Sequence, residues 1–423
     1  MHFQFAGPLV SKTPCFKIGE PIDPDDLWFR DEFIDLIWET IRKRHVLITA
    51  PRRTGKTSVM NHLAERPRDG FLVVSQNVQD LKHPSQLFET ILENFFENHQ
   101  STADRLIRGG WKLLGESTRW LKENVDSVGA GSIKIALRRT DPNWRSNWKQ
   151  HADETLRQLR GINKPVLLII DELPDLILNM RGTHDDELKE FLGWFRKVRQ
   201  QPSPSKDPIR WLIGGSVNLA STLDEIGEVD LINDIAMEPL PILTDDQVKD
   251  FVVRMLTAYG VEFSQTVPNR IVFHLGRPIP YFMQLLTQAV QRSYSRQQRN
   301  ITAKDVDKIF DAMVTSQDAQ SKLKHYHSRI ERYYRSPRQS AAYLLLSKLS
   351  QSSKKGISRR AMEQVFQKEL IDLAIQLDAS KQREQFNHLM RDLENDFYVC
   401  ECESDCFDFS SGVIKAWWRK YYG

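Results

Sequence analysis

The run KPVLLIIDELPDL, residues 164–176, constrains the fold of this chain more than any other stretch. A continuous apolar run without a polar face is typical of a strand that is buried on both sides in a parallel sheet. Stretches of helical spacing separate it from the other apolar runs, which are HVLITA (45–50), GFLVVSQ (70–76), IRWLIGGS (209–216) and DIAMEPLPIL (234–243). Strands that alternate with helical stretches predict a three-layer α/β sandwich.

A phosphate-binding loop is predicted at residues 51–58, PRRTGKTS, between an apolar run and a helical segment. The stretch matches G-x-x-x-x-G-K-[ST] except that Ala50 replaces the first glycine, which mainly eases the turn out of the strand. Gly55 permits close approach of the backbone, Lys56 supplies charge, and the Thr57 hydroxyl is expected on Mg²⁺. We therefore expect ATP as ligand and these contacts: Pro51, Arg52, Arg53, Thr54, Gly55, Lys56, Thr57 and Ser58.

Two adjacent carboxylates, Asp171 and Glu172, end the buried run. Such a pair is costly unless a cation or water receives it. Together with the loop, the pair predicts that Asp171 holds Mg²⁺ and that Glu172 orients and deprotonates an attacking water, which favours ATP hydrolysis. The alternative is that either residue caps a helix over LPDLILNM.

Ser216 and Asn218 follow the end of another predicted strand, in GGSVNLA. They are placed to touch the γ-phosphate or the attacking water, with Ser216 as a catalytic candidate. Ordinary turn chemistry explains them equally well.

With these motifs the chain resembles the archaeal-type ATPases of the AAA+/STAND class of P-loop proteins, which are distantly similar to origin-recognition ATPases. The resemblance covers nearly all of the chain. It implies a P-loop NTPase (ASCE/AAA+) sandwich with a helical lid and a C-terminal winged helix. The segments that carry it are DDLWFRDEFIDLIWETI (25–41), PRRTGKTS, IIDELPDL, the Gly-Ser turn after WLI, EPLPILTDDQVKDFV (238–252) and GRPIPYFMQLL (276–286).

The resemblance also implies roles for residues outside the loop. Leu27, Trp28, Phe29 and Arg30 would lie over adenine and ribose, although a helix cap with a core aromatic pair is the alternative. Arg277, in GRPIP, would act as a sensor arginine, unless it is a solvated lid residue.

No arginine lies between Ser216 and Arg254, where many ring-forming AAA+ proteins carry a trans-acting arginine finger. Arg196, Arg199 or Arg210 would have to substitute. This gap favours a switch or a loosely assembled homo-oligomer over a processive motor.

Four regions are predicted: an ATPase core at 1–240 with an insertion at about 101–163, a lid at 241–320, a basic linker at 321–336 and a winged helix at 337–423. The insertion contains VGAGSIKIALRR, which reads as a small hairpin. Residues 321–363 hold eleven Lys and Arg against two Glu, about +9 locally. The whole chain carries only +3, so any basic surface must be local.

Three helices followed by a hairpin predict the winged helix, and its third helix carries Lys381, Arg383, His388 and Arg391. These residues are expected to contact double-stranded DNA, with the basic cluster on the phosphates. A solvated helix face and a protein-contact module are the alternatives.

Cys400, Cys402 and Cys406 form C-x-C-x3-C on the predicted wing. A zinc site there would need help from Asp405, His388 or a partner, so incidental thiols are favoured. Four cysteines do not make a disulfide framework for a chain of 423 residues.

We expect an ATP-binding and ATP-hydrolysing switch that acts on DNA. One alternative is a nucleotide-stabilised module that hydrolyses negligibly and contacts an effector protein, and another is a ring-forming DNA-remodelling or loader ATPase. The sequence has no apolar run of about 18 residues and no signal-peptide pattern, so a cytoplasmic protein without a membrane partner is expected.

Overall fold

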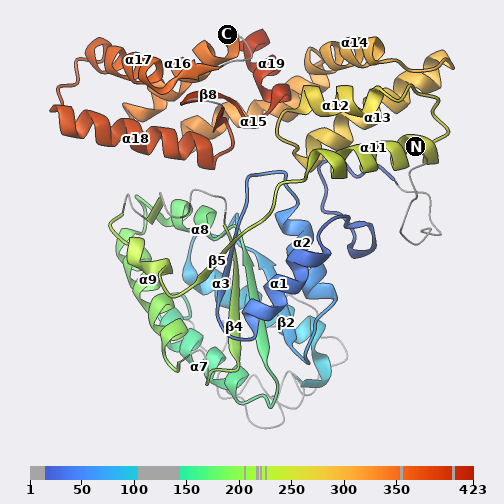
Figure 1. Ribbon diagram of the computed structural model, residues 1–423. Helices are drawn as coiled ribbons and strands as arrows, with labels where there is room; N and C mark the ends of the chain where they lie inside the picture. The colour runs from blue at the N-terminus through green and yellow to red at the C-terminus, as the bar shows by residue number, and fades with distance from the viewer. Residues whose placement is uncertain are drawn as a thin grey trace. The chain divides into compact units, whose positions relative to one another are not determined.

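The computed structural model describes residues 15–102, 143–203, 206–215, 219, 222–223, 226–352, 356–402 and 405–423. The hairpin expected in VGAGSIKIALRR lies outside these residues. The chain divides into two compact units, one of residues 21–241 and one of residues 242–423 together with the segment before Pro21 (Figure 1). Among the described residues, every helix is too short or too polar to traverse a lipid bilayer.

A parallel five-stranded sheet forms the centre of the first unit, in the order β2-β3-β4-β1-β5. All five predicted strands are confirmed. Their bounds are β1 Val46–Thr49, β2 Leu72–Asn77, β3 Val166–Asp171, β4 Ile209–Gly215 and β5 Ala236–Pro239. Strand β4 lies between β1, which leads into the loop, and β3, which ends in the carboxylates. Because the three strands are parallel, the loop and the carboxylates both lie at the edge of the sheet formed by the carboxyl ends of the strands.

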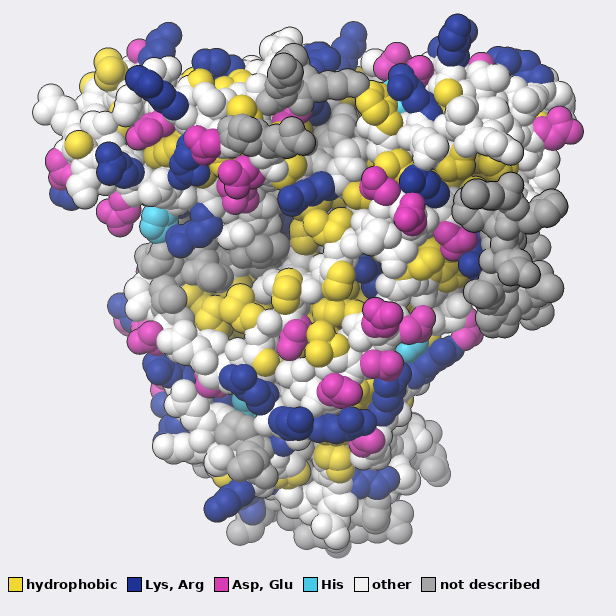
Figure 2. All heavy atoms as spheres, in the orientation of Figure 1, with side chains coloured by type: hydrophobic (Ala, Val, Ile, Leu, Met, Phe, Trp, Pro, Cys, Tyr) yellow, Lys and Arg dark blue, Asp and Glu magenta, His cyan; other side chains and the backbone are white. Residues whose placement is uncertain are grey.

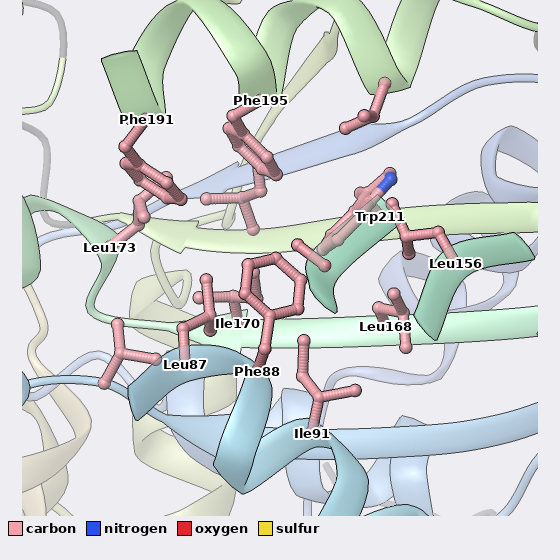
Figure 3. Close-up of a cluster of buried hydrophobic side chains, with 14 of the residues drawn as sticks. Leu87, Phe88, Ile91, Leu156, Leu168, Ile170, Leu173, Phe191, Phe195 and Trp211 are labelled. Atoms are coloured by element: carbon pink, nitrogen blue, oxygen red, sulfur yellow. The ribbon is translucent and has the colours of Figure 1, made fainter. Parts of the chain in front are cut away.

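Helices cover both faces of the sheet, which confirms the predicted three-layer sandwich. Alternate β3 residues enter opposite cores: Leu167 and Ile169 face α1 and α2, whereas Leu168 and Ile170 face α3, α7, α8 and α9 (Figure 3). This explains why β3 reads as a continuous apolar run. The helices are α1 Asp31–Ile41, α2 Lys56–Glu65, α3 Pro84–Asn98, α7 Trp148–Arg160, α8 Leu173–Met180 and α9 Asp185–Gln200, with 3₁₀ turns η1 Pro24–Asp26 and η4 Val229–Ile232.

Helix α3 shows how local sequence sets these elements. Leu87, Phe88 and Ile91 form an apolar stripe that points into the core (Figure 3). The helix begins at Pro84, and His83 caps it, because the His83 ring accepts a hydrogen bond from the Ser85 amide.

The second unit begins with four helices, which occupy the region predicted as a lid. Thr244 and Thr302 start two of them with capping boxes. Gly276, at φ 66°, ends another. The bounds are α11 Asp245–Ala258, α12 Val267–Leu275, α13 Pro280–Gln297 and α14 Ala303–Val314.

Helix α15, Gln317–Tyr333, occupies most of the segment that was expected to be a basic linker. Its Leu323 and Ile330 are buried on one face. Arg329 is buried as well and donates to Asp396 at 3.0 Å. The basic composition of this segment therefore overstates its solvent-exposed charge.

The C-terminal elements follow the order of a winged helix, with a three-stranded antiparallel sheet ordered β6-β8-β7. Phe386, Leu389, Met390 and Leu393 bury one face of the third helix. The elements are α16 Arg338–Gln351, β6 Ile357–Ser358, α17 Arg359–Asp372, α18 Ala379–Asn395, β7 Val399–Glu401, β8 Cys406–Phe409 and α19 Gly412–Tyr421.

Within this unit, α12 meets α19 through main-chain atoms. Gly276 forms an isolated antiparallel bridge with Ser411, and the Arg277 amide donates to the Ser410 carbonyl at 2.8 Å. A β-carbon at Gly412 would collide with the His274 carbonyl. Both contact positions therefore need glycine.

Candidate functional site

The loop between β1 and α2 turns at Gly55, which has φ 95° and precedes the first residue of α2. A side chain there would have room but would be strained by this backbone conformation. Ala50 is buried and does not share such a positive φ. The missing first glycine of the motif is therefore at a position where alanine fits without strain.

Lys56, Thr57 and Asp171 meet at this edge of the sheet. The Lys56 ammonium donates to Asp171 Oδ1, and the Thr57 hydroxyl donates to Asp171 Oδ2 at 2.7 Å. The Glu172 amide also donates to Asp171 Oδ1, at 3.0 Å. Because Lys56 is 7% exposed and Asp171 4% exposed, each needs the other to offset the cost of burial.

Glu172 completes the cluster, with Oε1 at 3.5 Å from the Lys56 ammonium. Its backbone is left-handed at φ 63°, and it stands at the cap position of α8 without a side-chain cap bond. Its other oxygen, Oε2, is buried without a hydrogen-bond partner. The side chain therefore does not cap the helix, and a strained residue with an unsatisfied carboxylate is typical of a functional position.

Gly214 in β4 leaves the space that the Asp171 carboxylate occupies. A β-carbon at Gly214 would collide with Asp171 Oδ1 and with the Met60 side chain. Gly214 is not among the residues predicted from the sequence, although a Gly-Gly pair within a strand signals close approach by a neighbouring group.

Arg30 holds the loop from the other side. Its guanidinium donates to the Pro241 carbonyl at 2.7 Å and to the Thr54 carbonyl at 3.2 Å. It is 4% exposed, and burial lowers its pKa to about 10. Arg30 therefore ties the loop to the segment that follows β5, a structural role that the sequence analysis did not assign.

Phe29 precedes Arg30 with a left-handed backbone at φ 62°. Its ring packs edge-on against Trp28, with 6.2 Å between the centroids. Both rings are partly exposed, so they are open to a ligand, and contact with adenine stays a prediction.

Several loop side chains bind within the protein. Arg52 lies 3.5 Å from the buried Asp175, and the Thr54 hydroxyl donates to the Pro51 carbonyl at 2.6 Å. The Ser58 hydroxyl accepts the Ile22 amide at 3.0 Å. Contacts with a nucleotide would therefore come from the backbone amides at the start of α2, which have no carbonyl partner in the helix.

Magnesium fits the oxygens present here. Thr57 and Asp171 present hard oxygen atoms side by side, and Gly214 keeps the space for the carboxylate clear. The described residues contain no group of three or more His, Cys, Asp and Glu side chains placed to hold a metal, and Cys400, Cys402 and Cys406 do not form one. A magnesium ion at this edge would therefore share its shell with phosphates and water.

The roles of three other predicted residues stay predictions. Ser216 and Asn218 lie outside the described residues. Arg277 belongs to the second unit, where its side chain is exposed. Its proposed sensor role remains a prediction.

Two of the three arginines that were considered as substitute arginine fingers form hydrogen bonds within the first unit instead. Arg199 is fully buried and binds both oxygens of Asp234 at 3.0 Å. Arg210 donates to the Ile41 carbonyl at 2.8 Å and is likewise buried. Burial lowers the pKa of both guanidinium groups. Neither arginine is available to a neighbouring subunit.

The exposed face of α18 carries the predicted DNA contacts. Lys381, Arg383 and Arg391 are exposed, and Arg391 donates to His388 Nδ1 at 3.1 Å. Glu384 and Glu394 are exposed on the same helix. Figure 2 likewise shows basic and acidic side chains interspersed over the visible surface.

Comparisons with known proteins support the fold. No protein-family model matches the sequence, and no curated protein matches it significantly. The chain is similar to a Walker-type ATPase of Pyrococcus abyssi, with a TM-score of 0.58 and 13% identity over 96% of this chain and 99% of that one. It is also similar to the ORC2 protein of Aeropyrum pernix, solved in ADPNP and ADP complexes, with a TM-score of 0.52 and 12% identity over 94% and 95%. The predicted resemblance to archaeal P-loop ATPases and origin-recognition proteins is confirmed at the level of the fold.

Proposed function

We propose that the cluster of Lys56, Thr57, Asp171 and Glu172 binds and hydrolyses ATP. The observation that carries this proposal is the meeting of the loop lysine and threonine with a carboxylate at the end of β3, beside a strained glutamate with an unsatisfied oxygen. Structural ion pairs do not need such a glutamate, because an unsatisfied buried carboxylate oxygen costs stability.

Lys56 is the residue that changes partners in this proposal. Its ammonium now lies between Asp171 and Glu172, close to the start of α2. Phosphate groups on the α2 amides would attract the ammonium away from the carboxylates. That exchange leaves Asp171 and Thr57 to hold magnesium, which when bound neutralises charge on the outer phosphates.

Glu172 then acts on water. Without the ammonium, its partly buried carboxylate becomes a base next to the site of attack. The absence of a cap bond leaves the side chain free to accept a water proton through Oε2. The left-handed backbone fixes the direction of the side chain relative to β3.

The test compares steady-state ATP turnover of the wild type and Glu172→Gln, each with and without double-stranded DNA. We expect the variant to retain ATP binding and to lose turnover by about 100-fold or more. Lys56→Ala should lose binding as well. Equal turnover of wild type and Glu172→Gln would reject the assignment of Glu172.

The nucleotide state is proposed to be read out by the second unit as a switch that acts on DNA through α18. Arg383 and Arg391 project from its exposed face and would neutralise phosphates. Replacing both with alanine should flatten the plot of log affinity against log salt by about 1.8, because each phosphate contact contributes about 0.9. Lys304→Ala with Lys308→Ala, two exposed lysines of α14, is the matched control.

The mixed charge on α18 favours a second candidate, a module that docks a protein through its winged helix. Glu384 and Glu394 oppose the approach of a phosphate backbone, and two basic residues of the expected cluster, Arg329 and Arg338, are buried in ion pairs. Unchanged DNA affinity in the Arg383→Ala, Arg391→Ala protein, with ATP bound tightly and not hydrolysed, would select this candidate.

A ring-forming remodelling ATPase is less well supported. Its trans-acting arginine cannot be Arg199 or Arg210, which are both buried. Arg196, on α9, forms no hydrogen bond or ion pair with another described residue and is the remaining candidate. Nucleotide-dependent assembly in light scattering, lost in Arg196→Ala, would revive this reading.

A further inference from the structure

A second pocket, of about 480 Å³, lies in the first unit beyond the end of β2. Lys82 and His83 line it from the turn before α3, Trp144 and Arg145 from the segment before α7, and His184 from the segment before α9. Strands β3 and β4 lie between β2 and the loop strand β1. At about 4.8 Å per strand, β2 and β1 are roughly 14 Å apart, so the pocket is separate from the phosphate loop.

His83 offers an unused donor to this pocket. Its Nδ1 accepts the Ser85 amide at 3.1 Å, so the neutral ring carries its proton on Nε2. Nε2 forms no hydrogen bond within the described part of the chain. The side chain is 4% exposed, so water satisfies this donor poorly. Nε2 lies on the side of the ring away from the helix start.

Two cations flank His83. Arg145 donates to His184 Nε2 at 3.3 Å and has no carboxylate partner among the described residues. Lys82 likewise forms no ion pair with a described residue. The ring centroids of His83 and His184 are 6.1 Å apart, at right angles. Four nitrogen-bearing side chains from three segments therefore converge on one opening.

The carboxylates nearby do not cancel this charge. Glu89 also lines the pocket, but it is buried and engaged in interactions of its own. Glu187 lies behind His184, 3.8 Å from its other ring nitrogen. Lys82 and Arg145 are left with positive charge to offer to a ligand.

We propose that this pocket binds a phosphate group. A doubly charged tetrahedral anion matches two cations and an N–H donor that approach from different segments. Trp144, which is buried, supplies an apolar wall against which the rest of the ligand packs. The phosphate belongs either to a small phosphorylated molecule or to a nucleic-acid backbone, and both present the same chemistry.

The pocket connects to the candidate catalytic carboxylates through the turn after β2. The Val78 amide donates to the Asp171 carbonyl at 3.0 Å. Asn179 of α8 donates to the carbonyls of Gln79 at 2.7 Å and Leu81 at 3.0 Å. Lys82 and His83, which line the pocket, therefore directly follow a turn that is hydrogen-bonded to both ends of the Asp171–Asn179 segment.

The test titrates full-length protein with inorganic pyrophosphate, and separately with a short double-stranded DNA, by calorimetry. Lys56→Ala forms the background, because it weakens binding at the phosphate loop. Lys82→Ala with Arg145→Ala removes both cations of the pocket. Lys43→Ala is the control, because Lys43 is an exposed lysine before β1, at the opposite edge of the sheet.

Two His83 variants separate binding from folding. His83→Asn and His83→Asp both keep a side chain that can cap α3. The aspartate variant adds a negative charge to the pocket, so it should bind the anion less tightly than the asparagine variant. Circular dichroism and the unfolding midpoint would show that the two variants fold alike.

We expect the Lys82→Ala, Arg145→Ala and the His83→Asp proteins to bind a phosphate probe at least about tenfold more weakly, because each lost charge-assisted hydrogen bond contributes about that factor. A loss with pyrophosphate indicates a small-molecule source, and a loss with DNA alone indicates a backbone source. The proposal is overturned if neither probe binds, or if Lys43→Ala reduces binding as much as the pocket variants.

Discussion

Two clusters of buried charge, one in each unit, are built in opposite ways. In the first unit, Lys56 lies between Asp171 and Glu172, and Glu172 Oε2 has no hydrogen-bond partner. In the second unit, Asp396 accepts from Arg329 through one oxygen at 3.0 Å and from the Tyr334 hydroxyl through the other at 2.8 Å. The two clusters thus differ in their carboxylates, because both oxygens of Asp396 are satisfied whereas one oxygen of Glu172 is not; the unsatisfied atom of the second cluster is a donor, Arg329 Nε. We call the first cluster incomplete and the second closed in this sense.

This difference distinguishes a candidate binding site from a cluster that stabilises the fold. A closed cluster repays the burial of its charges within the protein, and breaking it leaves a buried charge unpaired. An incomplete cluster keeps part of that cost until a ligand arrives. Burial of charge alone therefore does not mark function, whereas at Glu172 an unsatisfied oxygen coincides with a strained backbone and a neighbouring loop lysine.

The largest expected effect breaks the closed cluster. Asp396→Ala leaves Arg329 buried without a carboxylate, so the unfolding free energy should fall by about 3–5 kcal/mol. ATP turnover per folded molecule should not change. Urea denaturation followed by fluorescence measures the first quantity. Asp318→Ala, which removes an exposed partner of Lys322 on α15, should change nothing measurable.

A pH titration should distinguish the first unit. His45 is 1% exposed, donates through Nε2 to the Arg199 carbonyl at 3.0 Å and accepts the Trp211 amide through Nδ1 at 3.2 Å. Burial lowers its pKa to about 4.

Because the unfolded chain binds this proton near pH 6.5, stability is complete above that pH and falls as pH drops toward 4. The loss is about 3 kcal/mol. His45→Gln should flatten this part of the curve of unfolding free energy against pH. An unchanged slope in His45→Gln would show that another group controls acid unfolding.

A smaller effect comes from crowding the incomplete cluster. Gly214→Ala should displace the Asp171 carboxylate from Lys56 and Thr57 and lower ATP turnover by about tenfold, or about 1.4 kcal/mol. Gly215→Ala is the matched control, because its β-carbon would meet Leu47 at 3.4 Å, an ordinary contact. Equal turnover in the two variants would remove Gly214 from the positioning of Asp171.

The smallest effect concerns strain at Glu172. Glu172→Gly should relieve the left-handed backbone and the unsatisfied oxygen, raising the unfolding free energy by about 1 kcal/mol while turnover is lost. Glu172→Gln keeps the strain and should gain less. A loss of stability in Glu172→Gly would mean that the carboxylate holds the native structure together.

The strands and the core of the site could be predicted because their signals are local. Apolar runs gave the five strands, and the T-G-K-T and D-E pairs identified Lys56, Thr57, Asp171 and Glu172 as neighbours. The roles of Arg30 and Gly214 depend on groups far away in sequence, so no local pattern reveals them. Arg329 shows the reverse error, since a basic residue in a basic stretch reads as solvated until Asp396 is seen beside it.

The main-chain contact between α12 and α19 limits which residues relatives of this chain can carry there. Gly276 and Gly412 bring main chain against main chain, and a β-carbon at either position would crowd backbone atoms of the other segment. Replacement of either glycine by a larger residue would force the helices apart. Relatives that keep this contact are therefore expected to keep glycine at both positions, although the two are widely separated in the sequence.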